Sequence, residues 1–351
     1  MRKKISRPFQ LGMKIAVNFL PWRIPERLEG AGVIKELPDF LRKKGDRKAF
    51  IVTDKTLINL HLLDDLLTAL AETNTNYVVF DEVTPNPTDT CVEHGVTLYK
   101  QERCDCIIAF GGGSPMDCAK GVAARIVRPK KSIKQLQGVL KVMHRVPNIY
   151  AVPTTAGTGS ETTIAAVITC EADHHKASIN DISIMPRYAV LDPVLTVGLP
   201  PHITSTTGMD ALSHAVEAYT NNTYNTALEK DLCRNAVKLI YDNLYLAYQD
   251  GGNLEARQNM QLAAFYAGRA FSRGSVGYVH AIGHALGGRY GTPHGLVMSI
   301  LLPKVMKQYG SAAYPRLAEL YNACGMQTGA RMNLRRFCIS FISKKIIHNK
   351  F

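Results

Sequence analysis

Five residues between positions 210 and 294 have the types and the spacing of a transition-metal site. Asp210 and His214 stand four residues apart in a helical pattern, and His280 and His284 repeat that spacing further along the chain. Because residues i and i+4 lie on one face of a helix, each pair points in one direction. Together with His294 they can supply one carboxylate and three imidazoles, a donor set that suits a divalent transition metal. A single histidine of this kind is more often an ordinary core or surface residue, but the repeated spacing favours a metal site.

Two helices and a loop must bring these residues together. The helix that carries His280 is expected to end at Gly287 and Gly288, and His294 is expected in the loop after Pro293. From Val194 onward the sequence has helical periodicity and almost no strand signal. We therefore expect residues 193–351 to form an all-helical, metal-binding domain that carries the catalytic residues.

The first half of the chain alternates strand and helix. Apolar segments predict strands at residues 49–53, 77–80, 105–110, 149–152 and 188–191, with an amphipathic helix running from Asp54 through Leu70. The segment 105–110 is apolar nearly throughout, which is typical of a strand buried on both faces of a sheet. This alternation predicts an α/β domain with a parallel, doubly wound sheet over residues 1–192.

A glycine-rich turn follows the strand at 105–110. Gly111, Gly112 and Gly113 would let backbone N–H groups approach a bulky anion, and the helix N-terminus after them suits a pyrophosphate. Ser114 is expected to cap that helix, with proline at its first position and Asp117 completing a capping-box-like arrangement. Since the motif is not G-x-G-x-x-G, a tight strand-to-helix turn without a ligand is the alternative.

A second polar loop, Pro153 to Glu161, follows the strand at 149–152. The hydroxyls of Thr154, Thr155 and Thr158 at the carboxyl end of a parallel strand are suited to a nucleotide site, although a capped polar turn is also compatible. Asp54, also at a strand end, could accept the hydroxyls of an adenosine ribose and would repel a 2′-phosphate. That charge favours NAD over NADP, and the alternative is a helix cap.

Charge and composition exclude other classes of partner. The net charge of +13 is concentrated near the two chain ends and in a basic surface excursion over residues 128–145. Without aromatic interleaving or a recognition-helix pattern, these charges predict solvated faces and no nucleic-acid binding. No uncharged apolar run is long enough to cross a membrane, and the N-terminus is interpreted as a lead-in arm and not as a signal peptide. The eight cysteines lack any C-x-x-C pair, which favours reduced thiols and a cytoplasmic protein.

Five motifs in series give the chain a resemblance to a known family. GGGSPMD, PTTAGTGSE, LDPVLTVGLPP, TGMDALSHAVEAY and GHALGGRYGTPHG together resemble the iron-containing (group III) alcohol dehydrogenases, from about Gly30 to about Gly325. The resemblance implies a Rossmann-like dinucleotide-binding domain followed by an all-α metal domain. It also implies NAD(P)-linked interconversion of small alcohols with aldehydes or ketones, in a homodimer or a larger homo-oligomer.

The resemblance also implies site residues. It assigns the metal to Asp210, His214, His280 and His294, and it gives His284 a catalytic role in orienting substrate or relaying protons. Iron is the implied metal, although the same donors would hold Zn²⁺. Eleven residues are implied around the dinucleotide: Asp54, Asn86, Gly112, Gly113, Ser114, Asp117, Thr154, Thr155, Thr158, Thr163 and Lys176.

The substrate and the chain end are less constrained by the sequence. Phe271, Ile164 and Ala165 are apolar and, by analogy with the family, would border a pocket for a simple aliphatic alcohol. After about Gly325 the tail departs from the family pattern, as a truncated or frameshifted reading frame would. Two alternatives to an active dehydrogenase therefore stay open. One is a catalytically impaired NAD-binding paralogue, and the other is a related metal- and NAD-dependent lyase of the dehydroquinate synthase type.

Overall fold

The computed structural model describes residues 12, 17–172, 175–221 and 223–326. The chain divides into two compact units. One, here the α/β unit, comprises residues 24–155 and 160–198, and the other, here the helical unit, comprises residues 1–23, 156–159 and 199–351. Most of the expected N-terminal arm lies outside the described residues, as does the divergent tail after residue 326.

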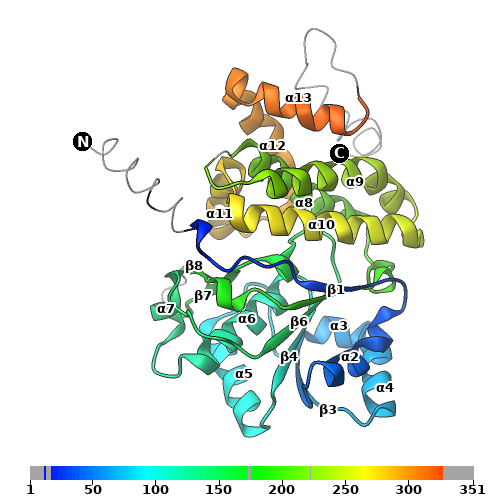
Figure 1. Ribbon diagram of the computed structural model, residues 1–351, viewed down its shortest axis with the longest axis vertical. Coiled ribbons are helices and arrows are strands. Elements are labelled where there is room, and N and C mark those ends of the chain that lie inside the picture. The colour runs from blue at the N-terminus through cyan, green and yellow to red at the C-terminus, as the bar shows by residue number, and fades with distance from the viewer. Residues whose placement is uncertain (1–11, 13–16, 173–174, 222, 327–351) are drawn as a thin grey trace. The chain divides into compact units, whose positions relative to one another are not determined.

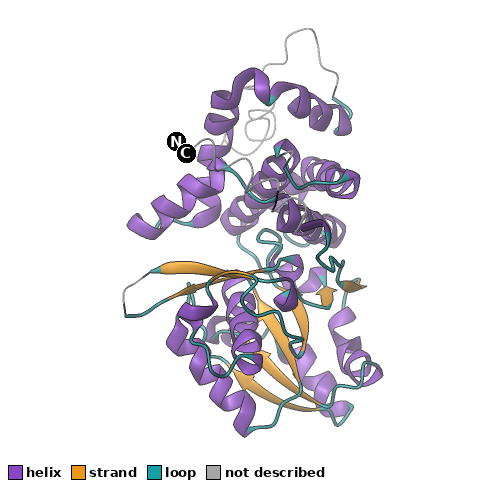
Figure 2. Cartoon of the chain, turned by 60° about the vertical axis from the view of Figure 1, so that its left-hand side comes forward, coloured by secondary structure: helices purple, strands orange, loops and turns teal. Residues whose placement is uncertain are grey.

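A parallel sheet forms the centre of the α/β unit. Its six strands lie in the order β1 (Glu26–Glu29), β9 (Tyr188–Leu191), β6 (Asn148–Pro153), β4 (Cys106–Gly111), β2 (Lys48–Val52) and β3 (Asn76–Phe80). Every neighbouring pair is parallel. The five predicted strands are confirmed, and β1 is an addition that the sequence pattern did not indicate. Figure 2 shows the strands of this unit and the absence of any strand from the described part of the helical unit.

Both faces of the sheet are covered by helices, which confirms the doubly wound architecture. In β4, Ile107 and Ala109 pack in one core with α5 (Asp89–Gln101) and α6 (Gly113–Val127). The alternate residues Ile108 and Phe110 pack in a second core beside α2 (Leu37–Lys43) and α4 (Asp64–Glu72). Figure 1 shows these two pairs of helices on opposite sides of the strands. Because successive side chains enter opposite cores, the strand has to be apolar throughout.

The order of the strands creates a switch point between β2 and β4. The chain goes from β2 outward to β3 and then returns to the other side of β2 with β4. In such sheets the connections after the two central strands diverge and leave a crevice at the carboxyl ends. Asp54 follows β2, and the Gly111–Gly113 turn follows β4. The predicted ribose-binding and pyrophosphate-binding segments therefore lie at neighbouring strand ends.

Several elements of the α/β unit differ from the sequence prediction. The helix expected from Asp54 to Leu70 is divided into α3 (Lys55–Asn59) and α4, because His61 takes a φ of 57° that a continuous helix does not allow. The basic excursion contains α7 (Ile133–Leu136) and β5 (Gly138–Val139). β5 joins β8 (Lys176–Asn180) and β7 (Ala165–Thr169) in a second small sheet. Short 3₁₀ helices complete the unit: Val33–Glu36, Ser160–Thr162, Ile182–Ile184 and Pro193–Thr196.

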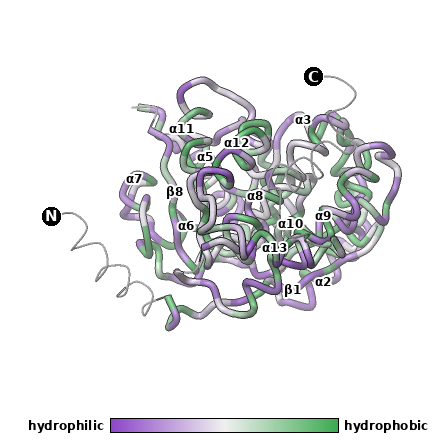
Figure 3. The backbone as a smooth tube through the Cα atoms, turned by 90° about the horizontal axis from the view of Figure 1, so that it is seen from above, coloured by the Kyte–Doolittle hydropathy of each residue, from purple (hydrophilic) through white to green (hydrophobic). Residues whose placement is uncertain are grey.

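The helical unit is built around α8 (Pro201–Thr220). Because most residues of α8 are buried on all sides, it is an internal helix, and α9 (Ala227–Gln249), α10 (Leu254–Gly274) and α12 (His294–Tyr309) pack against it. α11 (Tyr278–Tyr290) packs on α12, and the 3₁₀ turn Gly310–Ala312 leads to α13 (Tyr314–Ala323). α9 alternates hydrophobic and hydrophilic residues along its length, as expected of a helix with one face in a core (Figure 3).

Two local predictions for this unit were wrong. α11 does not stop at Gly287 and Gly288 but continues to Tyr290 and ends at Gly291, which has the left-handed φ of 65° common at helix ends. His294 is not in a loop, because it is the first residue of α12. Within the described residues, no helix combines the length and the apolar character needed to cross a membrane.

The end of β9 is fixed by one buried carboxylate. Asp192 accepts hydrogen bonds from the backbone N–H groups of Gly32 (3.0 Å), Ile34 (3.1 Å) and Val194 (3.0 Å). We predict that Asp192→Ala lowers the free energy of unfolding by about 3 kcal/mol, because it leaves these donors without their acceptor. Asp192→Asn keeps one acceptor oxygen, so its free energy of unfolding, measured with urea, should lie between those of Asp192→Ala and the wild type. An alanine variant as stable as the wild type would contradict this role for Asp192.

Candidate metal centre and dinucleotide-binding site

Three of the four predicted metal ligands converge on one point inside the helical unit. Asp210 Oδ1 lies 3.5 Å from Nε2 of His280 and 3.3 Å from Nε2 of His294. One ligand atom from each of these three residues lies within 4.8 Å of the others. His214 lies at the edge of the group, with its Nε2 4.0 Å from Asp210 Oδ1. The i,i+4 pair on α8 thus meets residues from α11 and α12.

Close helix packing brings His294 to α8. A Cβ atom at Gly295 would lie 2.3 Å from the backbone oxygen of Thr206, so only glycine lets the first turn of α12 approach α8 this closely. His214 is held by ring stacking, with centroids 4.2 Å from Phe271 and 4.4 Å from His280 at interplanar angles of 18° and 16°. These contacts fix the ring of His214 beside the cluster.

The donor atoms of the cluster fit a cation. Among the described residues, Asp210 Oδ1 and His280 Nε2 are buried, have no hydrogen-bond partner and face each other at 3.5 Å. Buried polar atoms normally have partners, and unpaired ones need an explanation such as an ion. One carboxylate and imidazole nitrogens facing one another supply that explanation, because they are the usual donors for divalent iron or zinc.

The charges in the cluster are consistent with this interpretation. Burial raises the pKa of Asp210, but the neighbouring histidines outweigh burial and hold that pKa well below its usual range. Burial lowers the pKa of His214 to about 3, so this imidazole is neutral near pH 7. Burial also lowers the pKa of His280, but the nearby carboxylates of Asp210 and Glu217 outweigh it and raise the pKa to about 9. A cation at Nε2 would take the place of that proton.

His284 lies beside the cluster without joining the set of close donor atoms. Its ring centroid is 5.1 Å from that of His294 and 5.9 Å from that of His280. The residue is exposed, whereas His280 is buried. An exposed imidazole next to the ligands can contact both a small molecule at the cluster and solvent.

In the α/β unit, the predicted dinucleotide residues Asn86, Ser114 and Lys176 come together. The backbone N–H of Asn86 donates to Ser114 Oγ (3.3 Å), and Lys176 Nζ donates to Asn86 Oδ1 (2.6 Å). They come from the loop after β3, the first turn of α6 and the start of β8. Their polar side chains thus gather beside the N-terminus of α6, where helix geometry favours an anion.

The capping prediction for α6 was wrong. Gly112 is the N-cap, no side chain caps the helix, and Gly113 is the first helical residue, so Ser114 is already inside the first turn. Gly111 has a φ of 144°, and a Cβ there would lie 2.6 Å from Pro115. Glycine is thus required where the chain enters the helix. Pro115 has no N–H and Met116 donates its N–H to Gly112 O (3.3 Å), so the half-buried Gly113 and Ser114 carry the N–H groups that could bind a ligand.

Asp117 does not complete a capping box either. Its carboxylate accepts hydrogen bonds from Ser160 Oγ (3.3 Å) and from the backbone N–H of Val167 (3.1 Å), and so ties α6 to β7. Burial raises the pKa of Asp117 to about 6. The sequence pattern considered only the local helix N-terminus, whereas the Asp117 carboxylate binds Ser160 and Val167, which are distant in sequence and close in the fold.

The predicted threonines occupy three different settings. Thr154 is buried and donates its backbone N–H to Gly111 O (3.1 Å), while the Thr155 side chain lies next to Gly112. Thr158 belongs to the short segment 156–159 of the helical unit. Thr163 is buried, and its hydroxyl accepts a hydrogen bond from Lys120 Nζ (2.8 Å) inside the α/β unit.

Asp54 is the N-cap of α3. It lies two residues after the end of β2, is half-buried, and its Oδ1 accepts the backbone N–H of Leu57 (3.1 Å). The alternative considered from the sequence, a helix cap, is therefore real. Capping uses one carboxylate oxygen, and the residue still stands at the carboxyl end of its strand beside the switch point.

Lys120 is a buried cation that the sequence reasoning missed. Its Nζ donates to Ser160 Oγ (2.9 Å), Thr163 Oγ1 (2.8 Å) and Ala165 O (2.9 Å), and its side chain is fully buried. Burial lowers its pKa to about 8. The available signal was a lysine three residues after Asp117 within an apolar helix. Lys120 holds the loop after β6 onto α6, the helix that follows the glycine-rich turn.

Comparison with known protein families gives matches over most of the chain. A family described as iron-containing alcohol dehydrogenase matches residues 25–193. The C-terminal region of the Fe-containing alcohol dehydrogenase family matches residues 204–342. This second match continues past Gly325, so the expected end of the resemblance at that residue is too early.

Individual proteins are also similar to this chain. The 1,3-propanediol dehydrogenase of Citrobacter freundii is 39% identical over 302 residues, which cover 85% of this chain and 77% of that protein. The NAD-dependent methanol dehydrogenase of Bacillus methanolicus is 38% identical over 317 residues, which cover 89% of this chain and 82% of that protein. A crystal structure of 1,3-propanediol oxidoreductase has a TM-score of 0.86 at 35% identity, covering 92% of this chain and 84% of that one.

A buried acid near Lys120 gives this region a pH-dependent stability. Glu161 is buried, and burial raises its pKa to about 7. Since its unfolded pKa is about 4.3, the folded state binds the extra proton, and stability decreases as the pH rises between those values. We predict that the free energy of unfolding of Glu161→Gln equals that of the wild type near pH 4.5 and exceeds it by about 3–4 kcal/mol above pH 7.

Urea unfolding at pH 4.5, 6 and 8 measures this difference. Glu72→Gln is the matched control, because Glu72 is exposed near the end of α4 and loses only a solvated charge. A difference between Glu161→Gln and the wild type that is the same at all three pH values would reject the buried-charge explanation.

Proposed function

Because the chain belongs to the iron-containing alcohol dehydrogenase family and is therefore an oxidoreductase acting on CH–OH groups, we propose that it is an Fe²⁺-dependent, NAD-linked dehydrogenase. It interconverts a small alcohol and its aldehyde or ketone by hydride transfer. The observation that carries the proposal is the convergence of ligand atoms from Asp210, His280 and His294, of which Asp210 Oδ1 and His280 Nε2 are buried and have no hydrogen-bond partner.

Four side chains hold the metal in this proposal. Asp210 supplies the carboxylate, His280 and His294 supply the imidazole nitrogens closest to it, and His214 is the fourth ligand from the next turn of α8. A divalent cation bound there acts as a Lewis acid that lowers the pKa of an alcohol hydroxyl. Iron is proposed because of the family, although the same donors have a high affinity for zinc.

His284 has the proton-transfer role. It is exposed and its ring lies 5.1 Å from that of His294, so it can exchange a proton between a substrate hydroxyl and solvent. Imidazole is suited to this task because its ordinary pKa is near neutral.

The α/β unit binds the dinucleotide. The start of α6, after Gly111, receives the pyrophosphate on the N–H groups of Gly113 and Ser114, and the side chains of Asn86, Ser114 and Lys176 contact it from the side. Asp54 accepts the adenosine ribose hydroxyls with the carboxylate oxygen that does not cap α3. NAD is favoured because one relative of this chain is named as an NAD-dependent methanol dehydrogenase.

The substrate is proposed to be a short aliphatic alcohol or diol. Phe271 stacks on His214 and gives the surroundings of the metal ligands an apolar side chain. The names of two relatives, a 1,3-propanediol dehydrogenase and a methanol dehydrogenase, refer to short alcohols. The described cysteines are all buried, as reduced thiols commonly are, which supports a reducing, cytoplasmic setting, and a homo-oligomer is proposed from the family.

The direct test is NADH formation from short alcohols and diols. The protein is purified without oxygen, loaded with Fe²⁺ and followed by the absorbance of NADH. We expect turnover that disappears with a chelator and returns with Fe²⁺, because the substrate hydroxyl loses the Lewis acid. Turnover that survives complete metal removal would reject the metal-dependent mechanism. An enzyme that binds metal and NAD but stays silent would be the impaired paralogue.

Ligand substitutions test the site residues. His280→Ala and His294→Ala should lose the bound metal and lower kcat/KM about a thousandfold or more, while NAD affinity measured by calorimetry stays unchanged. His202→Ala is the control, because His202 is an exposed histidine near the start of α8. Full metal content in either ligand variant would exclude that histidine from the site.

Cofactor choice tests Asp54. Asp54→Ser keeps a side-chain oxygen for capping α3 but removes the negative charge that repels a 2′-phosphate. We expect the ratio of kcat/KM for NADP to that for NAD to rise about tenfold, the equivalent of about 1.4 kcal/mol. Thr88→Ser, which conserves the N-cap of α5, is the control and should leave the ratio unchanged. An unchanged ratio in Asp54→Ser would place the ribose elsewhere.

A further inference from the structure

We propose that Glu217, which is not a ligand, is the positioning residue that orients His280 for the metal. The proposal rests on the metal site proposed above and adds a residue that binds a ligand histidine at its other ring nitrogen. Glu217 lies on α8, seven residues after Asp210 and three after His214. Positions separated by three, four and seven residues share one helix face. The same stripe of α8 therefore carries two proposed ligands and the support for a third.

The hydrogen bonds of His280 show how this works. Glu217 Oε2 lies 2.5 Å from Nδ1 of His280, while Nε2 on the other side of the ring lies 3.5 Å from Asp210 Oδ1. A carboxylate can only accept at Nδ1, so that nitrogen keeps its proton, and Nε2, which faces the cluster, is the nitrogen that can give up its proton to a metal. A carboxylate bonded to the outer nitrogen of a ligand histidine fixes its orientation and increases its basicity.

The same carboxylate also fixes the helix that carries His280. Glu217 Oε1 accepts the backbone N–H of Val279 (2.7 Å), and Oε2 also lies 3.4 Å from the backbone N–H of His280. These are first-turn donors of α11, whose N-cap Gly277 offers no side chain. Backbone and ring of His280 are thus held by one group, and both Glu217 and His280 are only 2% exposed. Any displacement of the carboxylate would move Nε2.

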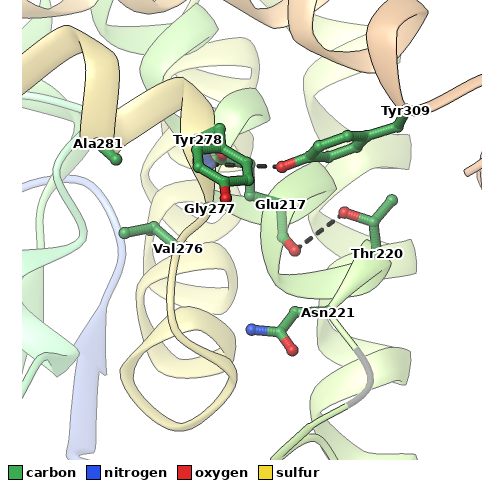
Figure 4. Close-up of a pocket in the computed structure, with 8 residues that line it drawn as sticks. All are labelled: Glu217, Thr220, Asn221, Val276, Gly277, Tyr278, Ala281 and Tyr309. Carbon is green, nitrogen blue, oxygen red and sulfur yellow. Dashed lines mark hydrogen bonds between the residues drawn. The ribbon is translucent and has the colours of Figure 1, made fainter. Parts of the chain in front are cut away.

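Gly277 makes this close approach possible. A Cβ atom there would lie 2.8 Å from Glu217 Oε1 and 3.3 Å from the hydroxyl of Tyr309. Figure 4 shows Glu217, Gly277 and Tyr309 together in the wall of a cavity of about 430 Å³. The backbone N–H of Tyr278 donates to that hydroxyl (3.4 Å), so Tyr309 contacts the same helix end through a different hydrogen bond. Tyr309 therefore provides a matched control for effects on α11 alone.

The test compares metal affinity with stability in two variants. Glu217→Gln keeps the side-chain volume but has only one acceptor oxygen. It therefore cannot accept hydrogen bonds from Val279 N–H and His280 Nδ1–H through two separate oxygens, as the carboxylate does. Tyr309→Phe removes one contact of α11 and leaves Glu217 in place. The apparent Kd for Zn²⁺ and Co²⁺ is measured by chelator competition on the full-length protein at fixed pH, together with the urea unfolding midpoint.

We expect Glu217→Gln to bind metal about 10–100-fold more weakly, whereas Tyr309→Phe changes at most the unfolding midpoint. If Glu217→Gln does not fold, Glu217→Asp, whose carboxylate is one methylene shorter, is expected to show the same loss. Wild-type affinity in a folded Glu217 variant would overturn the proposal and reduce Glu217 to a helix cap. A wild-type protein that binds neither metal would reject the metal site itself and, with it, this inference.

Discussion

Burial of the Asp210 carboxylate is the constraint on which the helical unit depends. A charged group that is only 3% exposed is costly unless opposite charge or hydrogen-bond donors compensate for it. The compensation comes from imidazoles on three helices, which form the proposed metal site with this carboxylate. α8 is therefore internal, and glycine at position 295 allows α12 to approach it closely enough for His294 to reach the carboxylate. Stability and chemistry depend here on the same side chains.

The α/β unit also contains a buried charged group, in this case a cation. Lys120 is fully buried, and oxygen atoms of Ser160, Thr163 and Ala165 surround its ammonium group. Asp117 lies on the same helix and binds the same loop through Ser160. Through these contacts the loop after β6 is held against the helix whose N-terminus is the proposed pyrophosphate site. Polar groups inside the unit thus determine the shape of its surface at the strand ends.

Sequence periodicity predicted regular elements well and their ends poorly. The five predicted strands are present because apolar runs bounded by polar residues mark strands packed in a sheet, with β4 buried throughout and the edge strand β3 partly exposed. The single helix expected from Asp54 to Leu70 was wrong, since apolar residues continue through the turn at His61 and conceal it. Ser114 was wrong as a cap because the glycine turn lets the helix begin earlier. Each error lies where backbone conformation, and not hydrophobic pattern, decides the structure.

The sequence by itself determined the parallel α/β architecture, the helical unit and the set of candidate ligands. These depend on spacing within single elements, which local periodicity encodes. Only the tertiary structure decided which atoms meet: that Nε2 of His280 faces Asp210 while Nδ1 faces Glu217, and that Asn86 joins Lys176. It also revealed Lys120 and Glu217, whose partners lie about 40 or 60 residues away along the chain. Such contacts arise when helices and strands pack, and no local pattern specifies them.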